Sequence, residues 1–350
     1  MIPSFQFSCP TKTAFGAHAL YHLPFDLAGM DACKAFVITD KQACEAQLDL
    51  QLSQAFKDSD MSLGIATLTD TDELNADFIE KLYHLFTEKG YDSIIALGTE
   101  KAVQIAKVLN MVLSLGPEFL RHFKEIQDIK APLLPLVFIP NLPADGRESS
   151  METLFQDRTF VSPFLMPDLV VISPDTMLSA PDDIILNSAL SSFAICCEAF
   201  VFSDNPLVRP YADLGIRLIM DSLLPLLRDI DLDKKEILYG KAGKKRKDPL
   251  SRIVHAAVIS GYMKSNVSDM KTAKKSLPRD MPRDILGELI HIFEGNSSPY
   301  LARLLLPLTD QDQYSATPEI QRPEAAIHAI QDFINELSVF FPKEASNGNT

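Results

Sequence analysis

The sequence has few cysteines and none of the spacings typical of a thiolate site. Its five cysteines are an odd number and include no CxxC pair, so neither a disulfide framework nor a thiolate zinc site is predicted. Compact metal motifs such as HExxH are also absent. Cys196 and Cys197 lie in an apolar segment, which is typical of buried, inert thiols, with a reactive thiol as the alternative.

The sequence also lacks the segments that carry a chain into or across a membrane. No run of about 18 apolar residues is free of charged side chains. The start of the chain does not show the basic residues and long apolar run of a secretory signal. We therefore expect a cytoplasmic protein with no membrane partner.

Basic residues are in the minority. The 47 acidic and 33 basic residues give a formal net charge of −14, which disfavours binding to a phosphate backbone. The basic cluster KAGKKRK at 241–247 is interpreted as a solvated loop between helices, with a nucleic-acid patch or a targeting signal as the alternative. We predict no nucleic-acid partner.

The chain does contain enough apolar residues for two cores. Its 350 residues exceed the usual size of one domain, and 46% of them are hydrophobic. In the first part of the chain, short apolar runs alternate with helical patterns, which predicts a parallel sheet covered by helices on both faces. The expected strands are 34–40, 62–68, 92–98, 134–140 and 167–173, and the expected helices are 47–60, 75–90 and 100–114.

Later in the chain the apolar spacing is mostly helical. We predict an α/β domain over residues 1–175, an all-helical domain over residues 176–342, and a flexible tail at 343–350. The expected helices of the second domain are 181–202, 212–230, 251–266, 283–295 and 323–341.

One strand, turn and helix has the outline of a diphosphate-binding turn. The stretch YDSIIALGTEKAVQIAK, residues 91–107, runs from an apolar strand through Gly98 into a helix. Backbone N–H groups at a helix start bind anions, and glycines let a phosphate approach the backbone. One glycine is few for this purpose, because Thr99, Glu100 and Lys101 follow it. Glu100 adds a negative charge there, and Lys101 adds a positive one.

The turn resembles that of the iron-containing (group III) alcohol dehydrogenases, which reads D-x-I-I-A-x-G-G-G-S-x-x-D-x-A-K. The matching positions are Asp92, Ile94, Ile95, Ala96, Gly98, Ala106 and Lys107. The replaced positions are Thr99, Glu100, Lys101 and Gln104. Further stretches match in the same order over residues 5–300, namely 7–24, 36–40, 135–150, 166–181 and 187–206.

The resemblance implies a fold, a reaction and a set of binding residues. The fold is dehydroquinate synthase-like, with a Rossmann-like α/β domain followed by an all-α domain. The reaction is NAD(P)-dependent oxidoreduction of an alcohol or aldehyde, with a small molecule in the interdomain cleft and a homodimer formed through the N-terminal segment. By resemblance, the cofactor-binding positions are Asp40 at the adenosine ribose, Gly98, Thr99, Glu100 and Lys101 at the diphosphate, and Asn141 and Leu142 on the nicotinamide side.

The sequence departs from the family on the nicotinamide side and at the metal site. Asn141, Leu142 and Ala144 replace two threonines and a glycine, while Asp145 and Arg147 add charges. The family binds a divalent metal through one Asp and three His, and the metal polarises the substrate oxygen. The corresponding positions here are Ser191, Ile195, Ala273 and the histidine-free segment 277–284. We therefore predict no metal at the usual site.

Other residues are weak substitutes for those ligands. We interpret His255 and His291 as surface or satisfied core histidines, with metal ligation as the alternative. Asp182 and Asp183 precede the helix that holds Ser191, and capping of that helix explains them as well as ligation does.

These observations leave several functional hypotheses. The first is an oxidoreductase of this family with NAD or NADP as the candidate cofactor and with its metal-dependent activity lost or altered. The second is a non-catalytic binding or regulatory relative, a pseudoenzyme. The third is a metal-free dehydrogenase in which Lys101, Arg147 or His255 polarises the carbonyl. No catalytic residue is assigned.

Overall fold

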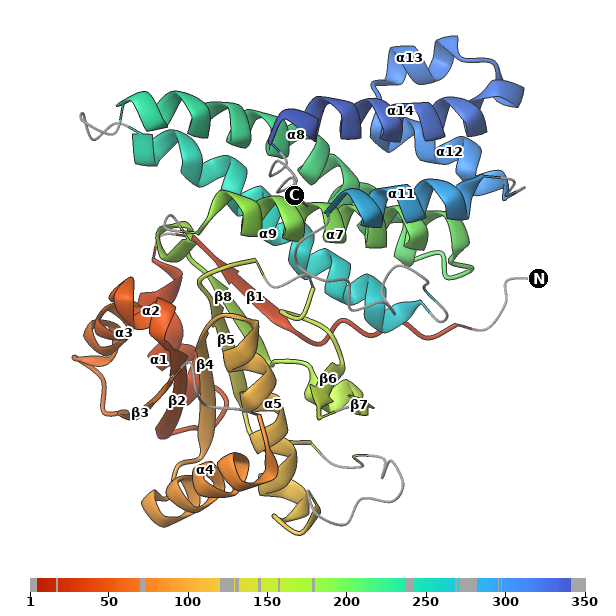
Figure 1. Cartoon of the computed structure of the whole chain (residues 1–350). Coiled ribbons are helices and arrows are strands. Elements are labelled where there is room, and N and C mark those ends of the chain that lie inside the picture. The colour runs from red at the N-terminus through yellow and green to blue at the C-terminus, as the bar shows by residue number, and fades with distance from the viewer. Residues whose placement is uncertain are drawn as a thin grey trace, which may run out of the picture. The chain divides into compact units, whose positions relative to one another are not determined.

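The computed structural model divides the chain into two compact units, Ser8–Ala180 and Pro181–Thr350, with Met1–Phe7 belonging to the second (Figure 1). The residues it describes are 5–16, 18–69, 74–119, 129, 132–143, 146–156, 158–177, 180–236, 242–267, 270, 282–294, 296 and 298–340. Within them, the backbone alone is described for 174–175, 229–236, 242–247 and 282–284.

The first unit is built on a six-stranded parallel sheet in the order β1-β8-β5-β4-β2-β3. Its strands are β1 Lys12–Phe15, β2 Lys34–Asp40, β3 Ser62–Leu68, β4 Ser93–Gly98, β5 Leu136–Pro140 and β8 Leu169–Ile172. All residues of β4, β5 and β8 are buried, as expected for a sheet covered on both faces. A separate antiparallel hairpin consists of β6 Glu152–Phe155 and β7 Arg158–Val161.

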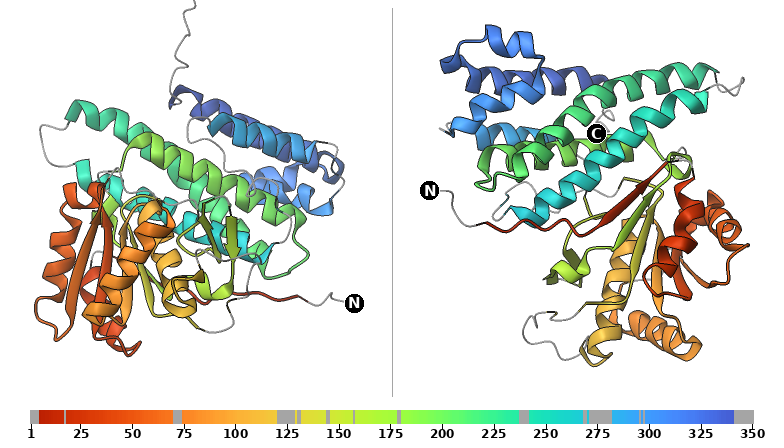
Figure 2. Two further views of the ribbon diagram at one scale, coloured as in Figure 1. Left: turned by 60° about the horizontal axis from the view of Figure 1, so that its bottom comes forward. Right: turned by 180° about the vertical axis from the view of Figure 1, so that it is seen from behind.

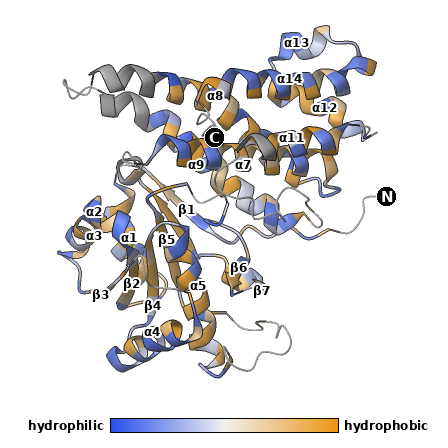
Figure 3. Cartoon of the chain, in the orientation of Figure 1, coloured by the Kyte–Doolittle hydropathy of each residue, from blue (hydrophilic) through white to orange (hydrophobic). Residues whose placement is uncertain are grey.

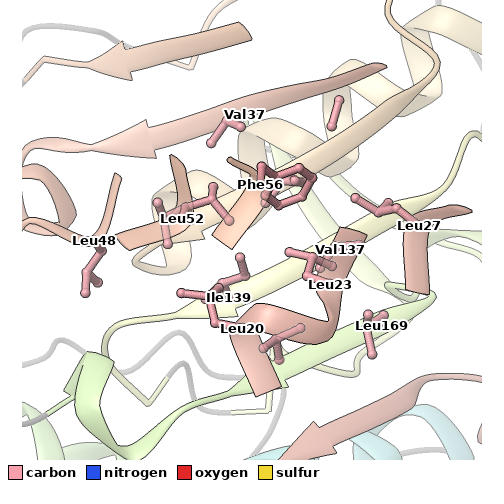
Figure 4. Close-up of a cluster of buried hydrophobic side chains, with 14 of the residues drawn as sticks. Leu20, Leu23, Leu27, Val37, Leu48, Leu52, Phe56, Val137, Ile139 and Leu169 are labelled. Atoms are coloured by element: carbon pink, nitrogen blue, oxygen red, sulfur yellow. The ribbon is translucent and has the colours of Figure 1, made fainter. Parts of the chain in front are cut away.

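One face of the sheet is covered by short helices. They are η1 Ala19–His22, α1 Leu23–Ala28, α2 Lys41–Glu45 and α3 Leu48–Phe56. Leu23 and Leu52 from these helices form a buried cluster with Val37, Val137 and Leu169 from the strands (Figure 4). This cluster is the core on that side.

The other face is covered by α5 Glu100–Leu115, which contacts β2, β4 and β5, with α4 Ala76–Lys89 beside it (Figure 2). Phe36 and Val37 are neighbours on β2, so their side chains point to opposite faces of the sheet. The ring of Phe36 packs against that of Phe86 on α4, with 5.9 Å between the centroids. The buried strands and α5 carry mostly hydrophobic residues (Figure 3).

The second unit is helical. Its helices are α7 Asp182–Phe202, α8 Val208–Glu236, α9 Ala242–Asn266, α11 Pro282–Phe293, α12 Pro299–Leu308, α13 Gln311–Ala316 and α14 Arg322–Leu337, with 3-10 turns at Glu319–Gln321 and Ser338–Phe340. Among the described helices, α7 has the length and apolar composition of a membrane span, but 83% of its apolar window is buried inside the protein. It is therefore the core helix of this unit. A Cβ at Gly215 would lie 2.6 Å from Cys196 Sγ, so this glycine lets α8 approach α7.

The fold class predicted from the sequence, an α/β domain followed by an all-α domain, is confirmed. One expectation about a single element needs correction, and three short strands were not foreseen. Residues 242–247 of the basic cluster form the first turns of α9 rather than a loop, because Lys and Arg favour helix; Lys241 lies outside the described residues. The strand β1 and the hairpin β6–β7 were not predicted, because four residues each are too few to show a clear apolar period. The tail 343–350 lies outside the described residues.

The N-terminal segment just before the first unit contacts the helical unit to which it belongs. The side-chain amide of Asn205 donates to the carbonyl of Gln6 at 2.9 Å. Phe7 stacks on Tyr211 with 5.4 Å between the ring centroids. These contacts explain why residues 5–7 group with the helices rather than with the sheet.

We predict that the helical unit loses stability as the pH falls through about 6.5, the ordinary pKa of histidine. Burial lowers the pKa of His255 on α9. The folded unit therefore binds a proton less readily than the unfolded chain, and acid favours unfolding. His255→Gln is expected to flatten the dependence of the unfolding free energy on pH, measured by urea titration between pH values of about 5 and 8.

His291 provides the matched control, because it is also on a helix of this unit but its side chain is 88% exposed. A His291→Gln variant that flattens the profile as much as His255→Gln would show that burial is not the cause.

Candidate functional site

The candidate site lies where β2, β4 and β5 end. The register sets Thr39 opposite Leu97 and Gly98 opposite Pro140, so these strand ends meet at one edge of the sheet. After β2 the chain continues into α2 and α3 on one face, and after β4 it continues into α5 on the other. In parallel sheets a ligand crevice forms at such a change of direction.

Asp40 ends β2, and its carboxylate reaches the turn between β4 and α5. One oxygen accepts from the N–H of Ala43 at 2.9 Å and caps α2. The other accepts from the N–H of Thr99 at 2.6 Å. Only 7% of Asp40 is exposed. Both carboxylate oxygens therefore bind the protein's own backbone.

Gly98 is required by this arrangement. Its φ is +132°, in the region that side-chain-bearing residues rarely adopt. A Cβ at Gly98 would lie 2.3 Å from Asp40 Oδ2. The space that the glycine leaves beside the turn is therefore filled by the Asp40 carboxylate.

The residues after Gly98 are held by partners in the same unit. Thr99 is the N-cap of α5 and makes no side-chain capping hydrogen bond. Glu100, the first residue of α5, forms an ion pair with Arg147, and their side chains are 22% and 38% exposed. Lys101 donates through Nζ to the carbonyl of Thr69 at 3.1 Å. The turn thus carries two carboxylates and two cations.

The segment after β5 adjoins the same turn. The N–H of Asn141 donates to the carbonyl of Gly98 at 3.1 Å. Asn141 is 4% exposed, and its Oδ1 has no hydrogen-bond partner among the described residues. Leu142 is half-buried, while Ala144 and Asp145 lie outside the described residues. The structure therefore brings Asp40, Gly98, Thr99, Glu100 and Asn141 to one edge of the sheet.

One face of α5 fixes the chain that carries Arg147. Lys107 is 2% exposed, and its Nζ donates to the carbonyls of Ser150 at 2.7 Å and Glu152 at 3.1 Å. Gln104 donates to the carbonyl of Leu154 at 2.6 Å. Residues 100, 104 and 107 have the spacing of one helix face.

Lys107 matches the family's motif, but the sequence alone gives this lysine no role. The detectable signal was the regular spacing of Glu100, Gln104 and Lys107 in an otherwise apolar helix. The partners of Gln104 and Lys107 are backbone carbonyls distant in the sequence, and residue type alone does not identify such partners.

Two of the positions at which the family resemblance implies metal ligands lie on α7. Ile195 has no donor atom and is 2% exposed, and Ser191 offers only a neutral hydroxyl. These two side chains do not fit a site made of carboxylate and imidazole. Of the other two positions, Ala273 and the segment 277–284, Ala273 and residues 277–281 lie outside the described residues, and only the backbone of 282–284 is described. Within the described part of the chain, no three His, Cys, Asp or Glu side chains gather as a metal site.

The remaining candidate residues lie on helices of the second unit. Burial lowers the pKa of His255, and His291 is exposed near Glu294, 3.9 Å away. Asp182 and Asp183 lie in the first turn of α7, where the helix dipole favours acidic residues. Burial raises the pKa of the Cys196 thiol to about 12, which leaves it protonated at neutral pH and agrees with an inert thiol.

Residues 10–174 match the family described as iron-containing alcohol dehydrogenase. Maleylacetate reductase of Sphingobium indicum is 24% identical over 66% of this chain, and the match spans only 60% of that protein. The alcohol dehydrogenase from Oenococcus oeni has a similar structure, with a TM-score of 0.76 and 18% identity over 96% of this chain and 88% of that one.

A further solved structure with this fold is sulfoacetaldehyde reductase from Bifidobacterium kashiwanohense in complex with NAD+. Its TM-score is 0.72, with 14% identity over 98% of this chain and 90% of that one. The family resemblance noted in the sequence is confirmed by these likenesses. At this level of identity, the structural likenesses establish the fold and leave the roles of the site residues as predictions.

We predict that Asp40→Ala lowers the free energy of unfolding by about 2–4 kcal/mol, because it leaves two backbone N–H groups without an acceptor and removes a helix cap. Urea denaturation measures this change. Asn75→Ala is the matched control, since Asn75 caps α4 through one N–H at 2.9 Å and its loss should cost about 1 kcal/mol. Equal losses for the two variants would contradict a double role for Asp40.

We also predict that Lys107→Met destabilises the first unit by about 2–4 kcal/mol, because buried carbonyls lose a charged donor. Amide hydrogen exchange should become faster at residues 147–154 than in the rest of the unit. Lys101→Met is the control, because Lys101 donates to one carbonyl from a partly exposed position, and about 0.5 kcal/mol or less is expected. Unchanged exchange at 147–154 in Lys107→Met would show that this lysine does not fix the segment.

Proposed function

We propose that this chain, whose residues 10–174 match the iron-containing alcohol dehydrogenase family, has lost or altered the family's NAD(P)-dependent alcohol or aldehyde oxidoreduction. The observation that carries this proposal is the hydrogen bond from the Thr99 N–H to the Asp40 carboxylate at 2.6 Å. The first backbone donor of the turn is thereby committed to the protein itself.

Electrostatics at the turn supports the proposal. A dinucleotide would bring a diphosphate toward Asp40 and Glu100, and like charges about 4 Å apart at an effective dielectric constant of about 20 repel by about 4 kcal/mol. A difference of that size weakens binding by about a thousandfold. Lys101 and Arg147 offset part of this repulsion, but Lys101 donates to the Thr69 carbonyl and Arg147 pairs with Glu100.

The residues of α7 support the same proposal on the metal side. A bound divalent metal supplies Lewis-acid polarisation of the substrate oxygen. Ser191 and Ile195 stand where the resemblance implies an aspartate and a histidine, and they do not fit such a cation. If both cofactor binding and metal binding are lost completely, the protein is a non-catalytic binding or regulatory protein.

A second candidate is a reductase that works without the family's metal. The likeness to a maleylacetate reductase favours a reductase, and the side chains of Ser191 and Ile195 favour one without the metal. In this candidate Lys101, Arg147 or His255 would polarise the carbonyl as a general acid. A small-molecule ligand, a homodimer and a cytoplasmic location stay predictions for both candidates.

We predict that neither NADH nor NADPH at about 1 mM raises the melting temperature by more than about 1 °C, with or without Fe²⁺ or Zn²⁺. A ligand present at its dissociation constant stabilises a protein by only about 0.4 kcal/mol, which corresponds to about that shift for a chain of this size. Thermal-shift titration measures it, and isothermal calorimetry checks the result.

The alcohol dehydrogenase from Oenococcus oeni, measured under the same conditions, serves as the family reference. A micromolar dissociation constant for either cofactor, or metal-dependent reduction of NAD(P)+ by an alcohol, would overturn the main proposal. Reduction of an aldehyde or keto acid by NAD(P)H in the presence of a chelator would select the metal-free candidate instead.

A further inference from the structure

We propose that the start of α5 is an anion-binding site in which the protein's own Glu100 carboxylate takes the place of the anion, and that Arg147 is the cation of this site. The inference rests on the proposed function, because it names the side chain that excludes a diphosphate from the turn. It also predicts which single change opens the turn to a small phosphate anion.

The position of Glu100 is that of a bound anion. Glu100 is the first residue of α5, a helix of 16 residues, and the N-terminus of a helix attracts negative charge. Its carboxylate pairs with the Arg147 guanidinium, a group that binds carboxylates and phosphates through the same donor fork. The Glu100 carboxylate therefore uses the two features that would otherwise recognise a phosphate group.

Arg147 is held beside α5 by contacts that do not involve Glu100. Lys107 donates to the carbonyl of Arg147 at 3.4 Å and to that of Ser150 at 2.7 Å. A turn at Gly146, whose φ is +84°, is closed by the Ser149 N–H donating to the Gly146 carbonyl at 3.3 Å. Replacing Glu100 should therefore leave the Arg147 backbone in place.

The site is accessible, and its charge balance depends on Glu100. The Arg147 side chain is 38% exposed, so an anion can reach it from solvent. Asp40 is buried and binds two backbone N–H groups, so it stays in place in a Glu100 variant. Among the described residues of the turn, Lys101 and Arg147 oppose Asp40 and Glu100, and removing the Glu100 charge shifts this balance by one positive charge.

The test is binding of inorganic pyrophosphate by isothermal titration calorimetry at low ionic strength. Glu100→Gln keeps the size of the side chain and removes its charge, while Glu100→Gly also removes its bulk. Both variants are expected to bind pyrophosphate at least about tenfold more tightly than the unchanged protein, the ratio that ~1.4 kcal/mol of lost repulsion produces. Adding Arg147→Met to Glu100→Gln is expected to abolish the gain.

Glu336→Gln is the matched control, since Glu336 also pairs with an arginine, Arg228 at 3.3 Å, but in the helical unit. Its pyrophosphate affinity should equal that of the unchanged protein. Glu100 variants that fold, as judged by their melting temperature, yet bind no more tightly overturn the inference, as does an equal gain in Glu336→Gln or a gain that survives Arg147→Met.

An NADH titration of the unchanged protein separates this inference from the proposed function. Tight NADH binding to the unchanged protein contradicts the proposed function whatever the Glu100 variants do. The ratio between variant and unchanged protein for pyrophosphate tests Glu100 alone.

Discussion

The hydrogen bond between the Asp40 carboxylate and the Thr99 N–H is the contact on which the rest of this site depends. It joins the end of β2 to the start of α5 at the point where helices leave the sheet on opposite faces. The backbone N–H groups at the start of α5 need an acceptor, because buried backbone donors are rarely left unpaired. Asp40 supplies this acceptor, and Gly98 must then lack a side chain because the carboxylate fills its space.

Helix α5 extends this arrangement to the segment after β5. Its apolar side covers β2, β4 and β5, and its polar residues Glu100, Gln104 and Lys107 hold residues 147–154. A lysine that is 2% exposed is tolerated because several carbonyls accept from its Nζ. The residues at positions 100 and 104, which differ from the family's motif, both bind the segment 147–154.

Physical reasons explain how far the sequence could predict this structure. Strands β2, β3 and β4 were predicted within a residue, because each reads as a short apolar run between helices. In β2 and β4 this run reflects burial in a parallel sheet. The turn at Gly98 was found from its place between a strand and a helix. The Thr99 partner of Asp40 and the partners of Lys107 were not found, because each lies about 40 to 60 residues away and is a backbone group, which looks the same at every position of a sequence. The pairing of Glu100 with Arg147 was also missed. The sequence shows both charges but does not show that the fold brings them together.

Proteins that share a fold can differ in their chemistry, and the turn between β4 and α5 shows why. Backbone geometry at a strand, turn and helix fixes where the N–H groups point, and this chain shares its fold, at a TM-score of 0.72, with a protein that is only 14% identical. What a turn binds then depends on the side chains that compete for the same donors. In this chain the Thr99 N–H donates to the Asp40 carboxylate, and Glu100 places a second carboxylate at the start of α5. Fold likeness therefore establishes the fold alone, and the function has to be argued from the site.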